Sequence, residues 1–262
     1  MIFTRHGCRL GYDVRGEGPA VLLLHPFPFD RRFFANLSLP GFRLVALDAR
    51  GFGDSELRCE VTIDELADDA VALLDHLGIP MAATLGCSMG GYVALSIAAR
   101  HAARLSALVL AGTRADADSE TARSNRDAAA AELRAHGPAR FLDVISVRLC
   151  GPGAPSAVRD EVQALATHSS PDLPRALRAT ILALRDRPDR STVVARLHLP
   201  ALVIAGADDS IVPLDEARAL KQSLAGARLA ELVGVGHLPS IESPAEFERV
   251  VSAFLESTLI AD

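Results

Sequence analysis

Thr84-Leu85-Gly86-Cys87-Ser88-Met89-Gly90-Gly91 lies between a short apolar run (81–85) and an apolar, helix-prone segment (92–100). A Gly-x-Ser-x-Gly motif between a strand and a helix is typical of a sharp turn that exposes the serine hydroxyl. The glycines two positions before and after the serine should let the two backbones approach, because a Cβ atom there would collide. The stretch therefore predicts Ser88 as a nucleophile on a strained turn.

The remaining strands are predicted from short apolar runs that alternate with segments of helical periodicity. Two short segments, 2–5 and 8–14, read as an opening hairpin, and the apolar runs lie at 20–24, 42–47, 105–110, 201–205 and 228–233. Helical spacing of apolar residues covers 62–77, 214–224 and 244–255. Strands without polar alternation are buried on both faces, so the pattern predicts a mostly parallel sheet covered by helices. In such sheets functional groups gather at the carboxyl ends of the strands.

Between the strands at 105–110 and 201–205 the sequence predicts helices without strands. They cover about 118–136, 138–149, 156–168 and 173–185. We predict a core domain formed by residues 1–112 and 201–262, with residues 113–200 inserted as a helical cap over the strand ends. An independent helical domain is the alternative. The cap is favoured because the strand pattern resumes directly after the insertion.

Composition excludes several classes of function. The 262 residues carry a net charge of −6, which argues against nucleic acid or an anionic membrane as the main partner. Residues 1–15 lack the continuous apolar stretch of a signal peptide, and the run at 20–24 is far too short to span a bilayer. The four cysteines (Cys8, Cys59, Cys87 and Cys150) show no paired spacing and the eight histidines no metal-site spacing. We therefore expect a cytoplasmic protein without metal or cofactor.

A serine nucleophile needs a base and a group that orients the base. The strand at 201–205 is followed by Asp208 and Asp209, and the strand at 228–233 is followed by His237. These candidates lie just past strand ends, in the chain order Ser, acid, His that Gly-x-Ser-x-Gly hydrolases use.

These motifs together resemble the α/β-hydrolase superfamily, and within it the lid-bearing esterase and lactonase branch that includes 3-oxoadipate enol-lactonases. The matching stretches are the loop at 25–30, Asp48-x-Arg50-Gly51-x-Gly53-x-Ser55, the serine motif, Gly206-x-x-Asp209-x-x-x-Pro213 and Gly236-His237-x-Pro239-x-x-Glu242-x-Pro244. The resemblance implies an α/β-hydrolase fold: a mostly parallel eight-stranded sheet covered by helices, with a helical cap inserted after the sixth strand.

The resemblance also implies a role for each site residue. Ser88 becomes the nucleophile, His237 the general base and then acid, and Asp209 the orienting carboxylate. Asp208 competes with Asp209, which is preferred because it lies three residues after Gly206 and four before Pro213.

The same resemblance predicts the oxyanion hole and the surrounding pocket. The backbone N–H groups of Phe27 and Met89 should form the hole, although Pro26 stands where the family usually has glycine. We predict His25, Phe29 and Leu238 as candidate pocket residues, with bracing of its own loop as the alternative for His25.

Three cap arginines, Arg123, Arg126 and Arg148, are candidates for binding an acidic substrate, and a solvated helix face is the alternative.

We expect a cofactor-free serine hydrolase that cleaves a small carboxylic ester or lactone through an acyl-enzyme intermediate. Carbon–carbon bond hydrolysis or lyase chemistry on the same triad remains open, as does a small-molecule receptor with little turnover. Epoxide and haloalkane hydrolysis are disfavoured, because those relatives have aspartate at the position of Ser88.

Overall fold

The computed structural model, which describes residues 1–58, 61–167 and 172–260, confirms the predicted sheet of eight strands. Their order across the sheet is β1-β2-β4-β3-β5-β6-β7-β8. The hairpin of β1 and β2 is antiparallel and joins β4 in antiparallel register, whereas β3 to β8 are mutually parallel. The strands are β1 (Ile2–Arg5), β2 (Cys8–Arg15), β3 (Ala20–Leu24), β4 (Arg43–Leu47), β5 (Ala82–Cys87), β6 (Leu105–Ala111), β7 (Ala201–Gly206) and β8 (Arg228–Leu232).

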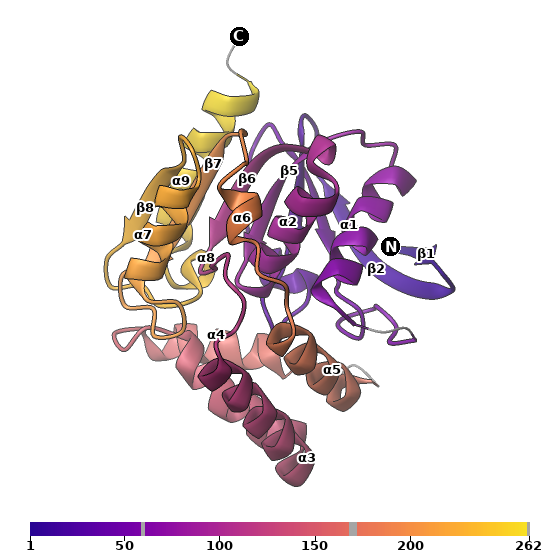
Figure 1. The fold of residues 1–262 in the computed structure, drawn as a ribbon, viewed down its shortest axis with the longest axis vertical. Coiled ribbons are helices and arrows are strands. Elements are labelled where there is room, and N and C mark those ends of the chain that lie inside the picture. The colour runs from indigo at the N-terminus through magenta and orange to yellow at the C-terminus, as the bar shows by residue number, and fades with distance from the viewer. Residues whose placement is uncertain (59–60, 168–171, 261–262) are drawn as a thin grey trace.

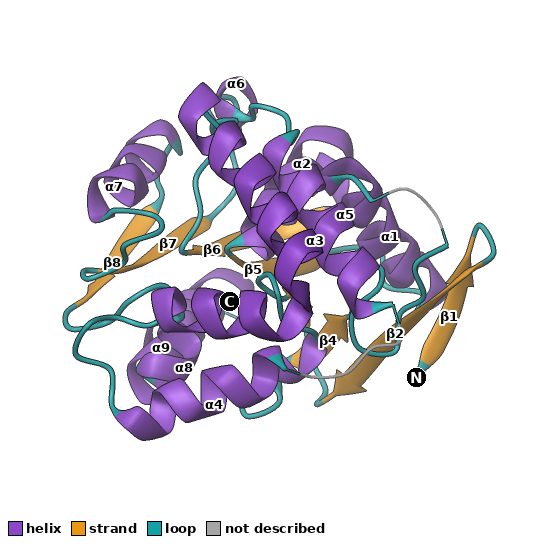
Figure 2. Cartoon of the chain, turned by 90° about the horizontal axis from the view of Figure 1, so that it is seen from below, coloured by secondary structure: helices purple, strands orange, loops and turns teal. Residues whose placement is uncertain are grey.

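Helices cover both faces of this sheet (Figure 2). The helices α1 (Ile63–His76), α2 (Met89–Arg100) and α7 (Leu214–Ser223) lie on one face, and α9 (Pro244–Leu259) lies on the other. Every residue of β5 and β7 is buried, which explains why their sequences show no polar alternation. Short helices that the sequence did not predict are η1 (Arg31–Phe34), η2 (Ala102–Arg104), α6 (Ser191–Val194) and α8 (Pro239–Glu242).

Local signals account for the ends of α1. The Thr62 hydroxyl accepts a hydrogen bond of 3.0 Å from the N–H of Glu65, as expected of an N-cap. Asp64 and Glu65 place negative charge in the first turn, where the helix dipole favours it. Beyond the last turn Gly78 has φ of 65°, a left-handed conformation that ends a helix at little cost for glycine.

Among the described residues of the insertion after β6, α3 (Glu120–Leu149), α4 (Ser156–Ala166) and α5 (Leu173–Arg185) lie at one end of the sheet, whereas the short α6 (Ser191–Val194) lies beside α2 and α7 of the core (Figure 1). We call α3, α4 and α5 the cap helices. The helix predicted at 156–168 ends at Ala166, and Cys59 and position 168 lie outside the described residues. The exact division into a core and a cap at residues 113 and 200 stays a prediction.

The two helices predicted at 118–136 and 138–149 form the two arms of the kinked α3. Gly137 breaks the helical geometry with φ of 79°, and Pro138 supplies no N–H for the preceding turn. We call residues 120–136 the first arm and residues 138–149 the second arm. None of the described helices combines the length and apolar character that crossing a bilayer requires.

Candidate active site

Ser88 occupies the sharp turn between β5 and α2. Its backbone angles, φ 51° and ψ −111°, are unusual for a residue with a side chain, as the motif predicted. The turn is held in place because the Ser88 N–H donates to the carbonyl of Ala111 at the end of β6, at 2.8 Å. The serine is half-buried, so its hydroxyl remains reachable.

The glycines of the motif are required by backbone contact. A Cβ atom on Gly90 would lie 1.9 Å from the carbonyl oxygen of Leu24, and one on Gly86 would lie 2.2 Å from that of Gly90. Such distances are far inside van der Waals contact, so only glycine lets α2 start this close to β3 and β5. This confirms the steric prediction made from the sequence.

His237 lies between Ser88 and Asp209. Its Nε2 is 2.8 Å from the Ser88 Oγ, and its Nδ1 is 2.7 Å from Oδ2 of Asp209. The carboxylate can only accept at Nδ1, so Nδ1 carries the proton and Nε2 is left to accept from the serine hydroxyl. His237 and Asp209 are almost fully buried, at 1% and 6% exposure, which strengthens their interaction.

The loop after β7 orients the Asp209 carboxylate toward His237, whereas the Asp208 side chain is exposed to solvent. The second carboxylate oxygen of Asp209, Oδ1, accepts from the N–H groups of Ile211 (2.8 Å) and Val212 (3.0 Å). These two bonds fix the carboxylate and leave Oδ2 for His237. Asp208 is exposed, and only its backbone N–H is engaged, with the carbonyl of Val235.

The predicted oxyanion donors lie on the two loops that flank the serine. Met89 is buried and is the first residue of α2. Because of this position, its N–H belongs to the unpaired, positive end of the helix. Phe27 is in the loop after β3, which is closed by a hydrogen bond from the Phe29 N–H to the Pro26 carbonyl at 3.0 Å. Pro26 therefore contributes its carbonyl to the loop and leaves the N–H of Phe27 unaffected.

A cavity of about 590 Å³ lies between the core and the cap helices. From the core it is lined by Phe27, a predicted oxyanion donor, and by Ser210 and Ile211, which follow Asp209. From the cap it is lined mainly by the two arms of α3, and its other lining residues are Arg114, Asp118, Ala122, Asn125, Arg126, Ala128, Ala129, Glu132, His136, Arg140, Phe141, Val144, Ile145, Arg148 and Ile181. Arg126 and Arg148 are thus placed at the cavity, whereas Arg123 is not among its lining residues.

The pocket candidates His25, Phe29 and Leu238 do not line this cavity, so the prediction was wrong for all three. Phe29 and Leu238 are buried in the hydrophobic core. His25 is 2% exposed and braces its loop: Nδ1 donates to the Pro26 carbonyl at 3.0 Å and Nε2 accepts from the Ala49 N–H at 2.9 Å. Burial lowers the pKa of His25, which keeps the ring neutral as these two bonds require.

Cys87 stands beside the nucleophile without sharing its chemistry. The side chain is buried, and burial raises the pKa of the Cys87 thiol far above its ordinary value. A thiol that stays protonated is a poor nucleophile, so Cys87 acts as a packing residue, as the sequence indicated.

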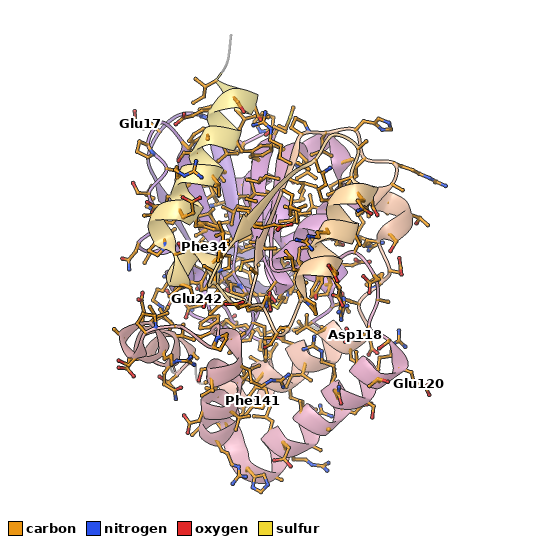
Figure 3. The ribbon with its side chains drawn as sticks, turned by 90° about the vertical axis from the view of Figure 1, so that its left-hand side faces the viewer. Glu17, Phe34, Asp118, Glu120, Phe141 and Glu242 are labelled. Carbon is orange, nitrogen blue, oxygen red and sulfur yellow. The ribbon has the colours of Figure 1, made fainter. Side chains whose placement is uncertain are left out.

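Glu242 ties the histidine loop to the cap, a role that the sequence motif contained but did not explain. Its Oε2 accepts from the N–H groups of Gly151 (2.8 Å) and Gly236 (2.9 Å), and its Oε1 accepts from that of Leu238 (3.0 Å). The N–H of His237 itself donates to the carbonyl at the end of α3. Figure 3 shows Glu242 where the core meets the cap helices. The carboxylate therefore holds both neighbours of His237 against the end of the second arm.

We expect Glu242→Gln to lower the stability of the protein and its kcat together. The amide keeps one acceptor oxygen but turns an NH₂ group toward a backbone donor, which costs about 1–3 kcal/mol for a buried group left unpaired. Denaturant unfolding and steady-state kinetics measure the two effects. Glu256→Gln, an exposed glutamate on α9, is the control. Wild-type stability and kcat in Glu242→Gln would contradict this role.

Comparison with known proteins places this geometry in a family. The model of the alpha/beta hydrolase fold family matches residues 19–244, most of the chain. This chain belongs to the α/β-hydrolase family. The assignment agrees with the strand–turn–helix around Ser88 and with the order of the triad candidates along the chain.

Similar α/β-hydrolases act on ester bonds. The chain is 27% identical to 3-oxoadipate enol-lactonase 1 of Acinetobacter baylyi, over 98% of this chain and 97% of that one. The structure of a thermophilic esterase from Thermogutta terrifontis, with malate bound, superposes with a TM-score of 0.91 at 30% identity, covering 98% and 97% of the two chains. The enol-lactonase from Burkholderia xenovorans superposes with a TM-score of 0.86 at 28% identity, covering 97% and 99%. This α/β-hydrolase is accordingly a hydrolase of the esterase and lactonase type.

Proposed function

We propose that the protein cleaves a small carboxylic ester or lactone through an acyl-enzyme formed on Ser88. The observation that supports this most is the continuous hydrogen-bonded chain from the Ser88 hydroxyl through His237 to Asp209. Such a chain activates a hydroxyl that is otherwise a weak nucleophile near neutral pH. The cavity of about 590 Å³ beside it is within the range for a small-molecule substrate.

In the proposed mechanism His237 takes up a proton and then gives it up in each of the two half-reactions, acylation and deacylation. Nε2 takes the proton from Ser88 as the hydroxyl attacks the substrate carbonyl, and Asp209 stabilises the imidazolium that forms. The tetrahedral oxyanion is received by the N–H groups of Met89 and Phe27. His237 then protonates the leaving alkoxide, which departs from an ester or stays attached to the acyl chain of an opened lactone. Water, deprotonated by the same Nε2, releases the acid and restores Ser88.

Hydrolysis of a chromogenic ester series of increasing acyl length, together with several lactones, tests this function. We expect turnover with an optimum among short acyl chains, and a mass increase equal to the acyl group on the peptide that contains Ser88 after rapid quenching. A protein that hydrolyses only ketonic carbon–carbon substrates, or that is stabilised by ligands without forming product, would overturn the proposal in favour of the corresponding alternative.

The cytoplasmic location expected from the sequence belongs to this proposal. Cys87 and Cys150 are buried free thiols, in keeping with a reducing compartment.

A further inference from the structure

The cavity between the core and the cap helices carries an excess of basic side chains. Among the described residues that line it, five are basic (Arg114, Arg126, His136, Arg140 and Arg148) and two are acidic (Asp118 and Glu132). Some of these basic groups already have a counter-charge within the protein, and only the others are available to a ligand.

Three of the five basic side chains are engaged with carboxylates. Arg114 lies 2.8 Å from Glu216 and 3.2 Å from Asp118, and Arg126 lies 3.2 Å from Asp118. His136 lies 3.4 Å from Glu132, one helical turn away. Both acidic residues of the cavity are therefore occupied.

Asp118 in particular has no capacity left for another cation. Its carboxylate also pairs with the buried guanidinium of Arg187. Burial alone would favour the protonated acid, but the hydrogen bond and charge of Arg187 hold the pKa of Asp118 below its ordinary value. Figure 3 places Asp118 where the cap helices begin, so this cluster serves to fix the cap.

Arg140 and Arg148 have no counter-charge among the described residues. Neither forms an ion pair with a carboxylate in the part of the chain that the structure describes (1–58, 61–167 and 172–260). Both are exposed, and both belong to the second arm. With Val144 they stand at positions i, i+4 and i+8, a single helical stripe facing the cavity.

Part of the cavity wall beside these arginines is apolar. The ring of Phe141 meets the ring of Phe27 at 6.2 Å in an edge-to-face arrangement, and Ile145 and Ile211 complete this part of the lining. The cavity therefore combines two cations of the second arm with an apolar surface that includes Phe27 of the proposed oxyanion loop. This polarity fits a chain with an anion at one end and an ester carbonyl at the other.

We propose that Arg140 and Arg148 form an anion-binding subsite, and that the substrate is an ester or lactone carrying a carboxylate away from the reacting carbonyl. The inference rests on the proposed function and adds the substrate class to it. Guanidinium groups bind carboxylates through charge-assisted, often bidentate hydrogen bonds, and they are less strongly hydrated than ammonium groups. Neither arginine has to break an internal ion pair with a described residue in order to bind.

Paired substrates and a double variant test the subsite. The 4-nitrophenyl monoester of glutaric acid is compared with the same ester whose free carboxylate is converted to an amide. We expect the wild type to prefer the anionic ester, and the preference in kcat/KM to fall by about tenfold or more, or ~1.4 kcal/mol, in R140Q/R148Q. Raising the ionic strength should increase the KM of the wild type for the anionic ester more than for the amide.

Arg134→Gln is the matched control, because Arg134 is an exposed arginine of the first arm and is not among the cavity-lining residues. It removes one positive charge from the same helix, half of what the double variant removes, and the preference should be retained. Equal loss of preference in this control would show a general charge effect and overturn the subsite.

Calorimetry with glutarate separates failure of the subsite from failure of the proposed function. Hydrolysis of both esters at equal efficiency, without glutarate binding, would overturn the subsite and leave ester hydrolysis standing. Glutarate binding that is lost in R140Q/R148Q, in a protein that turns over neither ester, would support the subsite and count against the proposed function. Neither turnover nor glutarate binding would overturn both.

Discussion

Replacing Ser88 by alanine is expected to reduce kcat for any ester substrate by on the order of 10⁴-fold or more. The variant retains the cavity and the oxyanion donors but loses the only atom that His237 Nε2 contacts for activation, at 2.8 Å. Removing the nucleophile of a comparable triad abolishes nearly all of the rate enhancement, and the residual catalysis comes from binding and the oxyanion hole. Initial rates with a short 4-nitrophenyl ester measure the loss.

Ser223→Ala controls for the substitution itself. Ser223 is exposed near the end of α7, where its hydroxyl bonds only to the Ala219 carbonyl. We expect wild-type rates in that variant and unchanged thermal unfolding in both. If Ser88→Ala retained a rate within tenfold of the wild type, the acyl-enzyme mechanism would be excluded.

Asp209→Asn is expected to lower kcat by about 10⁴-fold while the protein stays folded. The amide oxygen, in the place of Oδ1, can keep both hydrogen bonds from Ile211 and Val212, and the NH₂ group, in the place of Oδ2, can donate to Nδ1 of His237. The imidazole then adopts the other tautomer, with the proton on Nε2, and can no longer accept from Ser88. The rate as a function of pH measures the effect, because no pH restores the correct tautomer of the neutral ring.

Asp208→Asn is the matched control, since it makes the same change one residue earlier. Asp208 is exposed and its side chain has no part in the histidine contact, so activity should stay at the wild-type level. A reversal, with Asp208→Asn inactive and Asp209→Asn active, would assign the orienting role to Asp208.

Much of the core could be predicted from the sequence because its signals are local. The apolar runs of β3 to β7 are buried on both faces, so the lack of polar alternation in their sequences indicates a parallel sheet covered by helices. The glycines around Ser88 are predictable because a Cβ atom at either position would clash with the backbone of such a turn. The Cβ distances of 1.9 Å and 2.2 Å show this clash. His237 and the pair Asp208 and Asp209 are predictable as triad candidates because they follow strands whose carboxyl ends meet at one edge of the sheet.

The substrate side of the site could not be predicted in the same way. The spacing of apolar residues says which stripe of a helix is buried, but it does not say what the opposite stripe faces. The kink at Gly137 turns the second arm so that Arg140, Phe141 and Arg148 line the cavity. A helical pattern at 138–149 is equally compatible with a solvated face.

The sequence by itself determined the fold class, the strained serine turn and the order of the three triad candidates, because each depends on steric and burial rules that act within a short segment. Only the tertiary structure decided which aspartate faces the histidine, that His25 braces a loop instead of lining the pocket, and which arginines border the cavity. Those outcomes depend on how distant segments pack: Glu242 and Gly151 are 91 residues apart in sequence, yet one hydrogen bond between them helps to set the position of the cap over the histidine loop.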